Sequence, residues 1–372
     1  MNREIYLKRI EKLIGGLEEM GLRGIVVTGS SNLLYFTGTD AASLALIWDG
    51  GGPLLITSRL EYVRALEEAR IGEVVAYCEV EAATAPYEKV VKGDLYSVLR
   101  REVERVGLEP SKLGVTLSSL SYESYSRLTK ALGISPKDAT QLVKDLRAVK
   151  CREEVSLIEK AARIAEEALR KALNHLEKGV RECDVAALLA SEIRRRGALP
   201  AFEPIVAFGE HSAHPHAKVG SRKLREGELV KIDVGARVEG YCSDITRVTV
   251  VGRASKEQRR MLEAVLRAQE VAVAVIEDGA KACQVDEKAR EILKGEGFLE
   301  YFTHSLGHGL GLDVHEAPIL SPTSKDVLRR GMVVTVEPGV YVRGLGGVRV
   351  EDDVLVCEEG ARIITKFERE LL

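Results

Sequence analysis

The sequence has few amide side chains, few histidines and no long apolar run. Only three asparagines and four glutamines occur among 372 residues, although charged residues make up 30%. Because amides are heat-labile and ion-pair networks gain value at high temperature, this bias indicates a thermophilic source. No stretch approaches the roughly 18 apolar residues of a membrane span. The charged start MNREIYLKRIEKL is also unlike a secretion signal, so we expect a cytoplasmic protein without a membrane partner.

The cysteines lack any metal-binding or redox pattern. All six stand apart, at positions 78, 151, 183, 242, 283 and 357, without CxxC spacing. We therefore expect reduced thiols that serve as small core residues. A net charge of -3 gives no basic surface, so nucleic acid is not an expected partner.

Length and patterning predict two domains. Residues 1–135 alternate a helical pattern over 3–20 with apolar strands such as GIVVTG, SLALIWD and PLLITS, which is typical of an α/β domain. This part carries no catalytic cluster, and we expect Trp48 and Tyr35 to serve packing rather than to reach a partner's site. Residues 136–372 form the second predicted domain.

The second part of the chain repeats itself. EKGVRECDVAALLASEIRRRG (177–197) and EDGAKACQVDEKAREILKGEG (277–297) share Glu, Gly, Cys, Val and a final Gly at a constant offset. Each copy follows an alanine-rich helical stretch, over 153–176 and 256–277, and precedes strand-like sequence. Two similar halves predict an α+β domain with internal pseudo-twofold symmetry and a site where the halves meet.

Two predicted hairpins carry opposed carboxylates. In residues 229–251, a turn centred on Val238 and Glu239 puts Asp233 opposite Asp244. Aspartate is depleted in strands, and two opposed carboxylates repel one another unless a cation lies between them. Either residue alone could be a turn cap or a solvated edge charge. As a pair they indicate a cation site.

The second hairpin, in residues 333–356, repeats this arrangement. Pairing about Gly344 puts Glu337 opposite Glu351, in the second half of the repeat. Four converging carboxylates require several positive charges, which two divalent ions nearly balance. Oxygen ligands with an imidazole suit Mn, Co, Fe or Zn. Two such ions, bridged by carboxylates, are typical of hydrolytic sites.

The histidines gather near these hairpins. Three of the seven lie in THSLGHGLGLDVHEAP, which starts at Thr303. The glycines of GHGLG let the backbone approach a crowded centre, so His308 can supply the nitrogen ligand. His315 is better placed for the substrate, and HSAHPHAK adds His216; an imidazole there can stabilise an oxyanion. For the other histidines we expect structural roles at His175, His211 and His304, and leave His214 open.

The same segments resemble the motifs of a known family. KIDVGARVEGYCSDITR, GHGLGLDVHEAP, VEPGVYV and GVRVEDDVLV are similar to those of the pita-bread metallopeptidases, over roughly residues 140–372. That family includes prolidase, aminopeptidase P, methionine aminopeptidase and the metal-free creatinase. NLLYFTG resembles the creatinase/prolidase N-terminal domain more loosely. The resemblance implies a dinuclear metallopeptidase that hydrolyses Xaa-Pro bonds in small peptides, and it implies a homodimer.

The resemblance also implies roles for individual residues. Asp244 and Glu351 would bridge two divalent ions, and the remaining metal ligands would be Asp233, His308 and Glu337. Glu337 would in addition move the proton between water and the proline nitrogen. His216, His315 and Arg349 match residues that bind substrate or the reaction intermediate.

Sequence features separate the branches of the family. The leader of about 130 residues argues against methionine aminopeptidase, and the complete ligand set argues against creatinase and against a non-catalytic binding protein. Prolidase is favoured. However, related prolidases often have arginine directly after HExP, suited to a dipeptide's free carboxylate, where this chain has Ile319. Aminopeptidase P activity on longer peptides therefore remains the alternative.

Overall fold

The computed structural model describes residues 1–80 and 83–370. The chain folds into two compact units, Met1–Arg147 and Ala148–Leu372. The boundary lies beyond the one expected at residue 135, because the helix that follows it hydrogen-bonds back to the first unit. The Tyr35 hydroxyl donates to the Leu146 carbonyl at 2.8 Å, and Arg147 donates to Asn32 at 2.7 Å.

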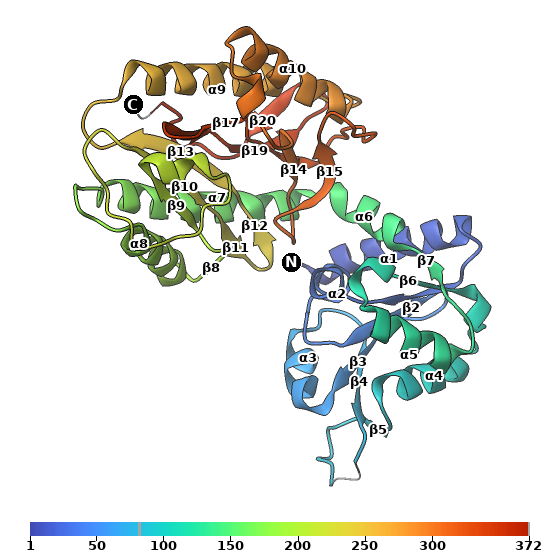
Figure 1. The fold of residues 1–372 in the computed structure, drawn as a ribbon. Helices are drawn as coiled ribbons and strands as arrows, with labels where there is room; N and C mark the ends of the chain where they lie inside the picture. The colour runs from blue at the N-terminus through green and yellow to red at the C-terminus, as the bar shows by residue number, and fades with distance from the viewer. Residues whose placement is uncertain (81–82, 371–372) are drawn as a thin grey trace. The chain divides into compact units, whose positions relative to one another are not determined.

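The first unit is built on a seven-stranded mixed sheet with the order β5-β4-β3-β2-β1-β6-β7 (Figure 1). β2 is antiparallel to both β1 and β3, and the other neighbours are parallel. Its strands are β1 (Gly24–Val27), β2 (Leu44–Trp48), β3 (Leu54–Ser58), β4 (Glu73–Cys78), β5 (Val90–Lys92), β6 (Leu113–Val115) and β7 (Lys137–Asp138).

The helices of this unit include the one expected over residues 3–20. They are α1 (Arg3–Glu19), α2 (Ser30–Thr37), α3 (Tyr62–Glu68), α4 (Leu95–Arg105), α5 (Tyr122–Leu132) and α6 (Thr140–Ala148). The apolar sides of α4 and α5 pack on the sheet in one core. The short helix α2 was not predicted, since most of its residues are buried and its polar side gives no periodic signal. Tyr35 lies on α2 and is 5% exposed, which agrees with its expected packing role.

The second unit contains four long helices and several small antiparallel sheets. The helices are α7 (Arg152–Leu173), α8 (Glu182–Arg195), α9 (Lys256–Ala274) and α10 (Ala282–Gly295). The strands of the first half are β8 (Leu199–Pro200), β9 (Ile205–Phe208), β10 (Leu229–Val234), β11 (Ala236–Val238), β12 (Tyr241–Cys242) and β13 (Ile245–Val250). Those of the second half are β14 (Gly307–Gly309), β15 (Glu316–Leu320), β16 (Val333–Val336), β17 (Gly339–Val342), β18 (Gly346–Arg349), β19 (Asp352–Val356) and β20 (Ala361–Ile363).

The predicted repeat is present in this unit. Helices α8 and α10 have 14 residues each. The first residue of α10 is 100 positions after the first residue of α8, and the same holds for their last residues. Before each helix a glycine has a positive φ, 96° at Gly179 and 90° at Gly279. The amide of each glycine donates to a leucine carbonyl, of Leu224 and Leu328 respectively. The two halves thus share local structure as well as sequence.

The sheets lie between the helix pairs. Helices α7 and α8 form one core with β9 and β10, while α9 and α10 form another with β16 and β19 (Figure 1). The sheet β13-β10-β9 and the sheet β15-β14-β16-β19-β20 meet at a bridge between Thr246 and Glu351. The predicted carboxylates lie along this junction.

Candidate metal centre

A cavity of about 400 Å³ lies where the two halves meet, and the predicted site residues line it. The strands bring together residues from both hairpins and both histidine segments. The lining includes Asp233, Asp244, Glu337, Glu351, His216, His304, His308, His315 and Arg349. An apolar side is formed by Phe202, Ile205, Val314 and Ile319.

The predicted register of the first hairpin is wrong by two residues. Asp233 pairs with Thr246, not with Asp244. The reason is the turn, which is formed by Glu239 and Gly240 with φ of 48° and 90°; positive φ at both positions is typical of a two-residue hairpin. The sequence analysis centred the turn one residue earlier. Because a shift of two preserves the side of the strand, Asp233 and Asp244 still face the same cavity.

The predicted register of the second hairpin is confirmed. β17 and β18 pair Gly339 with Arg349, and β16 and β19 pair Val336 with Asp352. Between these two ladders, Glu337 therefore lies opposite Glu351.

Three of the four acidic residues are almost completely withdrawn from solvent. Asp233, Asp244 and Glu351 are 6%, 5% and 2% exposed. Among the described residues, Asp233 Oδ1 and Asp244 Oδ1 are buried without a hydrogen-bond partner. Buried charged oxygens normally have partners or bind metal. These orphaned oxygens therefore fit a cation site.

Three side chains from different segments of the chain already have a ligand arrangement. Asp244, His308 and Glu351 each present a donor atom, and these atoms lie within 4.8 Å of one another. His308 Nδ1 donates to the Gly309 carbonyl at 3.1 Å, so Nε2 is the ring nitrogen that faces the carboxylates. Nε2 lies 3.3 Å from Glu337 Oε1.

The glycines beside His308 have the expected steric reason. A β-carbon on Gly307 would lie 2.0 Å from the Thr335 carbonyl oxygen, and one on Gly309 would lie 2.2 Å from that of Ala317. β14 therefore fits between β15 and β16 because its flanking residues have no side chain.

Thr246 and Arg349 connect the acidic residues. The Thr246 hydroxyl donates to Glu351 Oε2 at 2.6 Å and accepts from Arg349 Nε at 3.1 Å. Arg349 also pairs with Asp233 and lies 3.9 Å from Glu337 Oε2. The sequence analysis missed Thr246. Thr246 lies two residues after Asp244, so alternation along the strand would have placed both side chains on the side that faces the cavity.

The pKa values of the carboxyl groups in the cavity do not all shift in the same direction. Burial first, and then the charges of Glu351 and Asp233, raise the pKa of Asp244 well above its ordinary value. Burial and the charges of Glu337 and Asp233 do the same to the pKa of Glu351. Burial also acts against ionisation of Glu337, but the hydrogen bond and charge of His308 outweigh it and lower its pKa. Of these three carboxyl groups, Glu337 is the one best suited to remain anionic without added cations.

His304 belongs to the cavity through a hydrogen-bond chain. Arg349 Nη1 donates to the Tyr341 hydroxyl at 2.8 Å, and that hydroxyl donates to His304 Nε2 at 2.9 Å. His304 Nδ1 in turn donates to the Ser305 carbonyl at 2.8 Å. Burial lowers the pKa of His304, and burial raises that of Tyr341 to about 12. Tyr341 was not predicted from the sequence.

The remaining histidines lie in three different places. The rings of His308 and His315 have centroids 4.3 Å apart, and His216 lines the same cavity. His211 and His214 instead line a separate cavity, where His211 Nδ1 lies 2.7 Å from the buried carboxylate of Glu182. His175 is exposed.

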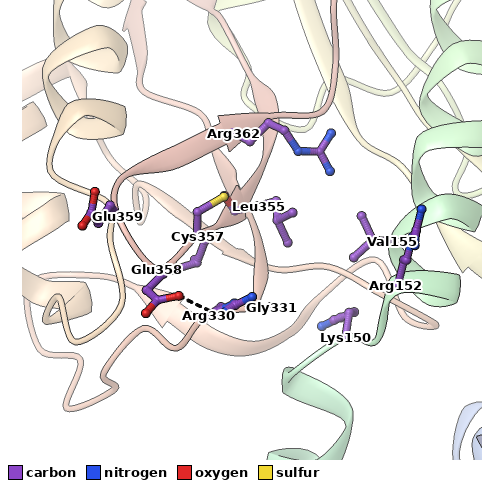
Figure 2. A pocket seen from close by; sticks show the side chains of 11 residues that line it. Lys150, Arg152, Val155, Arg330, Gly331, Leu355, Cys357, Glu358, Glu359 and Arg362 are labelled. Carbon is purple, nitrogen blue, oxygen red and sulfur yellow. Dashed lines mark hydrogen bonds and ion pairs between the residues drawn. The ribbon is translucent and has the colours of Figure 1, made fainter.

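A larger cavity of about 670 Å³ has no such cluster (Figure 2). It is lined by charged side chains from the start of α7 and from the β19–β20 region, including Lys150 and Arg362. Their charges are already paired, Lys150 with Glu316 at 3.3 Å and Arg362 with Glu159 at 2.6 Å.

Comparison with known proteins agrees with this geometry. The pattern of metallopeptidase family M24 matches residues 156–358, and that of the Creatinase/Prolidase N-terminal domain matches residues 9–149. The Xaa-Pro dipeptidase of Pyrococcus furiosus is 39% identical over 369 residues, which are 98% of this chain and 99% of the relative.

Solved structures give the same result. The Xaa-Pro dipeptidase from Bacillus anthracis has a TM-score of 0.89 and 35% identity, with 99% of each chain covered. The X-Pro aminopeptidase from Thermotoga maritima has a TM-score of 0.84 and 33% identity, covering 95% of this chain and 99% of its own. The resemblance inferred from the motifs is confirmed: the chain belongs to metallopeptidase family M24 and begins with a Creatinase/Prolidase N-terminal domain.

Proposed function

We propose that this protein is an Xaa-Pro dipeptidase that uses two divalent cations. The observation that carries this proposal is the set of buried carboxylates and His308 around one cavity, with two orphaned oxygens. The ligands would be Asp233, Asp244, His308, Glu337 and Glu351. Mn, Co, Zn or Fe fit this donor set. Full-length relatives named Xaa-Pro dipeptidase support the substrate class.

Bound divalent cations would supply a Lewis acid for the scissile carbonyl and a water that is acidic near neutral pH. Glu337, anionic and next to the cavity, takes the proton of the attacking water and delivers it to the proline nitrogen that leaves. Arg349 keeps Asp233 in place through their ion pair. The chain itself thus provides proton transfer and ligand orientation.

His315 and His216 would bind the reacting carbonyl. Burial first, and then the charge of His308, lower the pKa of His315, so its ring is neutral at neutral pH and offers one N–H donor. A donor aimed at the developing oxyanion lowers the barrier because it needs no reorganisation during the reaction. The apolar side chains of Phe202 and Ile205 in the same cavity suit the proline ring.

Activity on longer peptides is the second candidate function. Ile319 is 41% exposed at the cavity and provides no charge for a dipeptide's carboxylate. In the described part of the chain, Arg349 is the one guanidinium lining this cavity, and all three of its nitrogens already have protein partners. The similarity to the X-Pro aminopeptidase from Thermotoga maritima is consistent with this alternative.

A peptide panel with metal add-back tests the proposal. The chelated protein is given Mn²⁺ or Co²⁺ and assayed on Xaa-Pro dipeptides, Xaa-Pro tripeptides and matched Xaa-Ala peptides. We expect metal-dependent cleavage of the Xaa-Pro bonds with no cleavage of Xaa-Ala. Equal or faster cleavage of tripeptides would favour the aminopeptidase activity. Cleavage that is unaffected by chelation would contradict the metal mechanism.

The Ile319→Arg variant separates the two activities. A guanidinium at this position could pair with the carboxylate of a dipeptide, and a charge-assisted hydrogen bond contributes roughly 1.5–3 kcal/mol. We expect the kcat/KM ratio of dipeptide to tripeptide to rise about tenfold or more. Ile319→Met, which adds no charge, is the matched control.

We propose that the protein is cytoplasmic, that it forms a homodimer, and that it comes from a thermophile. All six cysteines are free thiols, but only Cys242 is buried and the other five are partly exposed, so the expected core role applies to Cys242 alone. None of the described helices is long and apolar enough to cross a membrane.

A further inference from the structure

A lysine is completely buried beside the metal centre, and the mechanism above does not use it. Lys231 lies on β10, two residues before Asp233, and its side chain is on the same face of the strand. It is 0% exposed. A buried ammonium group is costly unless hydrogen bonds satisfy it, so its partners indicate what it does.

Its partners are three carbonyls of one segment. Lys231 Nζ donates to Ser212 at 3.0 Å, to His214 at 2.6 Å and to Pro215 at 3.2 Å. An ammonium group has three N–H donors and no acceptor. The three contacts therefore use the whole group, and Lys231 has nothing left to offer a substrate or a metal ion.

This segment leads directly to His216, which follows Pro215 and lines the metal cavity. The segment has a second anchor from the other half of the domain, since the Gly347 amide donates to Ser212 Oγ at 2.8 Å. Arg349 Nη1 also donates to the Pro215 carbonyl, at 3.2 Å. The chain before His216 is thus held from both halves, with Lys231 making the largest number of these contacts.

We propose that Lys231 is a positioning residue that holds His216 in place for catalysis. This inference rests on the proposed function insofar as it concerns activity. Lys231 binds no reacting group. It fixes the carbonyls of residues 212–215, and so sets where the next imidazole meets the substrate. A displacement of about 1 Å of a substrate-positioning group can cost about 10²-fold in rate.

A double-mutant cycle tests this role. Lys231→Met keeps the length of the side chain and removes the donors, and His216→Ala removes the group that it positions. At saturating metal, we expect Lys231→Met to lower kcat/KM about 10- to 100-fold in the wild-type background. In the His216→Ala background we expect a change of about twofold or less, because coupled residues are non-additive.

A matched control separates positioning from general destabilisation. Tyr241 is 1% exposed and its hydroxyl donates to Glu154 at 2.7 Å, outside the cavity lining. Tyr241→Phe therefore removes a buried hydrogen bond without touching the His216 segment. We expect it to lower Tm while its effect on kcat/KM is near unity and additive with His216→Ala. An additive Lys231→Met effect, or one explained by lost metal content, would overturn the proposal.

Hydrogen exchange gives a readout that does not depend on activity. The His214 amide donates to the His211 carbonyl at 3.1 Å, so its exchange reports the order of the segment. We expect faster exchange over residues 211–217 in Lys231→Met and unchanged exchange in Tyr241→Phe. Unchanged exchange in both variants would refute the anchoring, even if the protein cleaves no Xaa-Pro bond.

If Lys231→Met does not fold, Ser212→Ala replaces it. That variant removes the hydroxyl that accepts from Gly347 and leaves the lysine in place. It should lower kcat/KM by less than Lys231→Met would, and again only when His216 is present. The same loss in the His216→Ala background would overturn the proposal.

Discussion

Replacement of Thr246 by valine should weaken metal binding although Thr246 is not a proposed ligand. Its hydroxyl donates to Glu351 Oε2 at 2.6 Å and accepts from Arg349 Nε at 3.1 Å. Both partners are buried, at 2% and 3% exposure. Valine has the same shape but no hydroxyl, so the variant leaves a carboxylate and a guanidinium each without one partner.

Two estimates of the expected loss of metal affinity agree. A hydrogen bond to a charged group is worth roughly 1.5–3 kcal/mol, which corresponds to about 10- to 150-fold in an equilibrium constant. Loss of a partner that orients a metal ligand typically costs about 10- to 100-fold in affinity or activity. We therefore expect Thr246→Val to weaken metal binding by about 10- to 100-fold.

Isothermal titration of the chelated protein with Mn²⁺ measures this effect directly. Thr246→Ser retains the hydroxyl and serves as the control, for which we expect an affinity within a few-fold of wild type. Circular dichroism verifies that both variants are folded. If Thr246→Val bound Mn²⁺ as tightly as wild type, Glu351 would not depend on this hydrogen bond and the reasoning would be refuted.

Three other changes test separate parts of the site. Glu337→Gln should lower kcat for Xaa-Pro cleavage by about 10²–10⁴-fold. Steady-state kinetics at saturating metal measures this loss. Substantial turnover by the variant would show that Glu337 does not transfer the proton. Gly307→Ala should lower the free energy of unfolding by about 1–3 kcal/mol or more, because its β-carbon would lie 2.0 Å from the Thr335 carbonyl oxygen. Chemical denaturation measures this change. Unchanged stability would contradict the close approach of the two strands. Because burial raises the pKa of Asp244 and Glu351 above their unfolded values near 4, their contribution to metal-free stability falls as pH rises above about 4. Added Mn²⁺ should therefore raise Tm more at pH 8 than at pH 5 in thermal scans, and the reverse order would contradict the pKa directions.

Much of this site could be predicted because its residues stand at the spacing of regular elements. Glu337 and Glu351 were found opposite one another from the strand pattern alone, and the glycines beside His308 were interpreted correctly as a steric requirement. Periodicity also located the long helices, since their apolar stripes are strong signals. The repeat followed from matches at a fixed offset.

What could not be predicted depends on details that no pattern encodes. The register at Asp233 depends on which residues of the Val238–Gly240 segment have a positive φ. The sequence does not determine this, and it is known only from the folded turn. Several partners of Arg349 come from segments that are distant in sequence, such as Pro215 and Asp233. Pairwise contacts of this kind depend on tertiary packing rather than on local spacing.

The charge distribution of the site agrees with its proposed use. The cavity gathers four carboxylates, while Arg349 provides a single guanidinium that is already engaged. Such an excess of buried negative charge costs free energy in the folded chain. Divalent cations would offset this cost. The buried carboxylates therefore lower the stability of the metal-free protein and raise its affinity for metal ions.

Anomalous X-ray diffraction from crystals grown with Mn²⁺ tests the central claim most directly. We predict two strong peaks in this cavity, about 3.5–4 Å apart. Asp244 and Glu351 should lie between them, and Asp233, His308 and Glu337 should complete the coordination. Peaks located elsewhere, or a cavity that binds no Mn²⁺ at saturating concentration, would contradict the account.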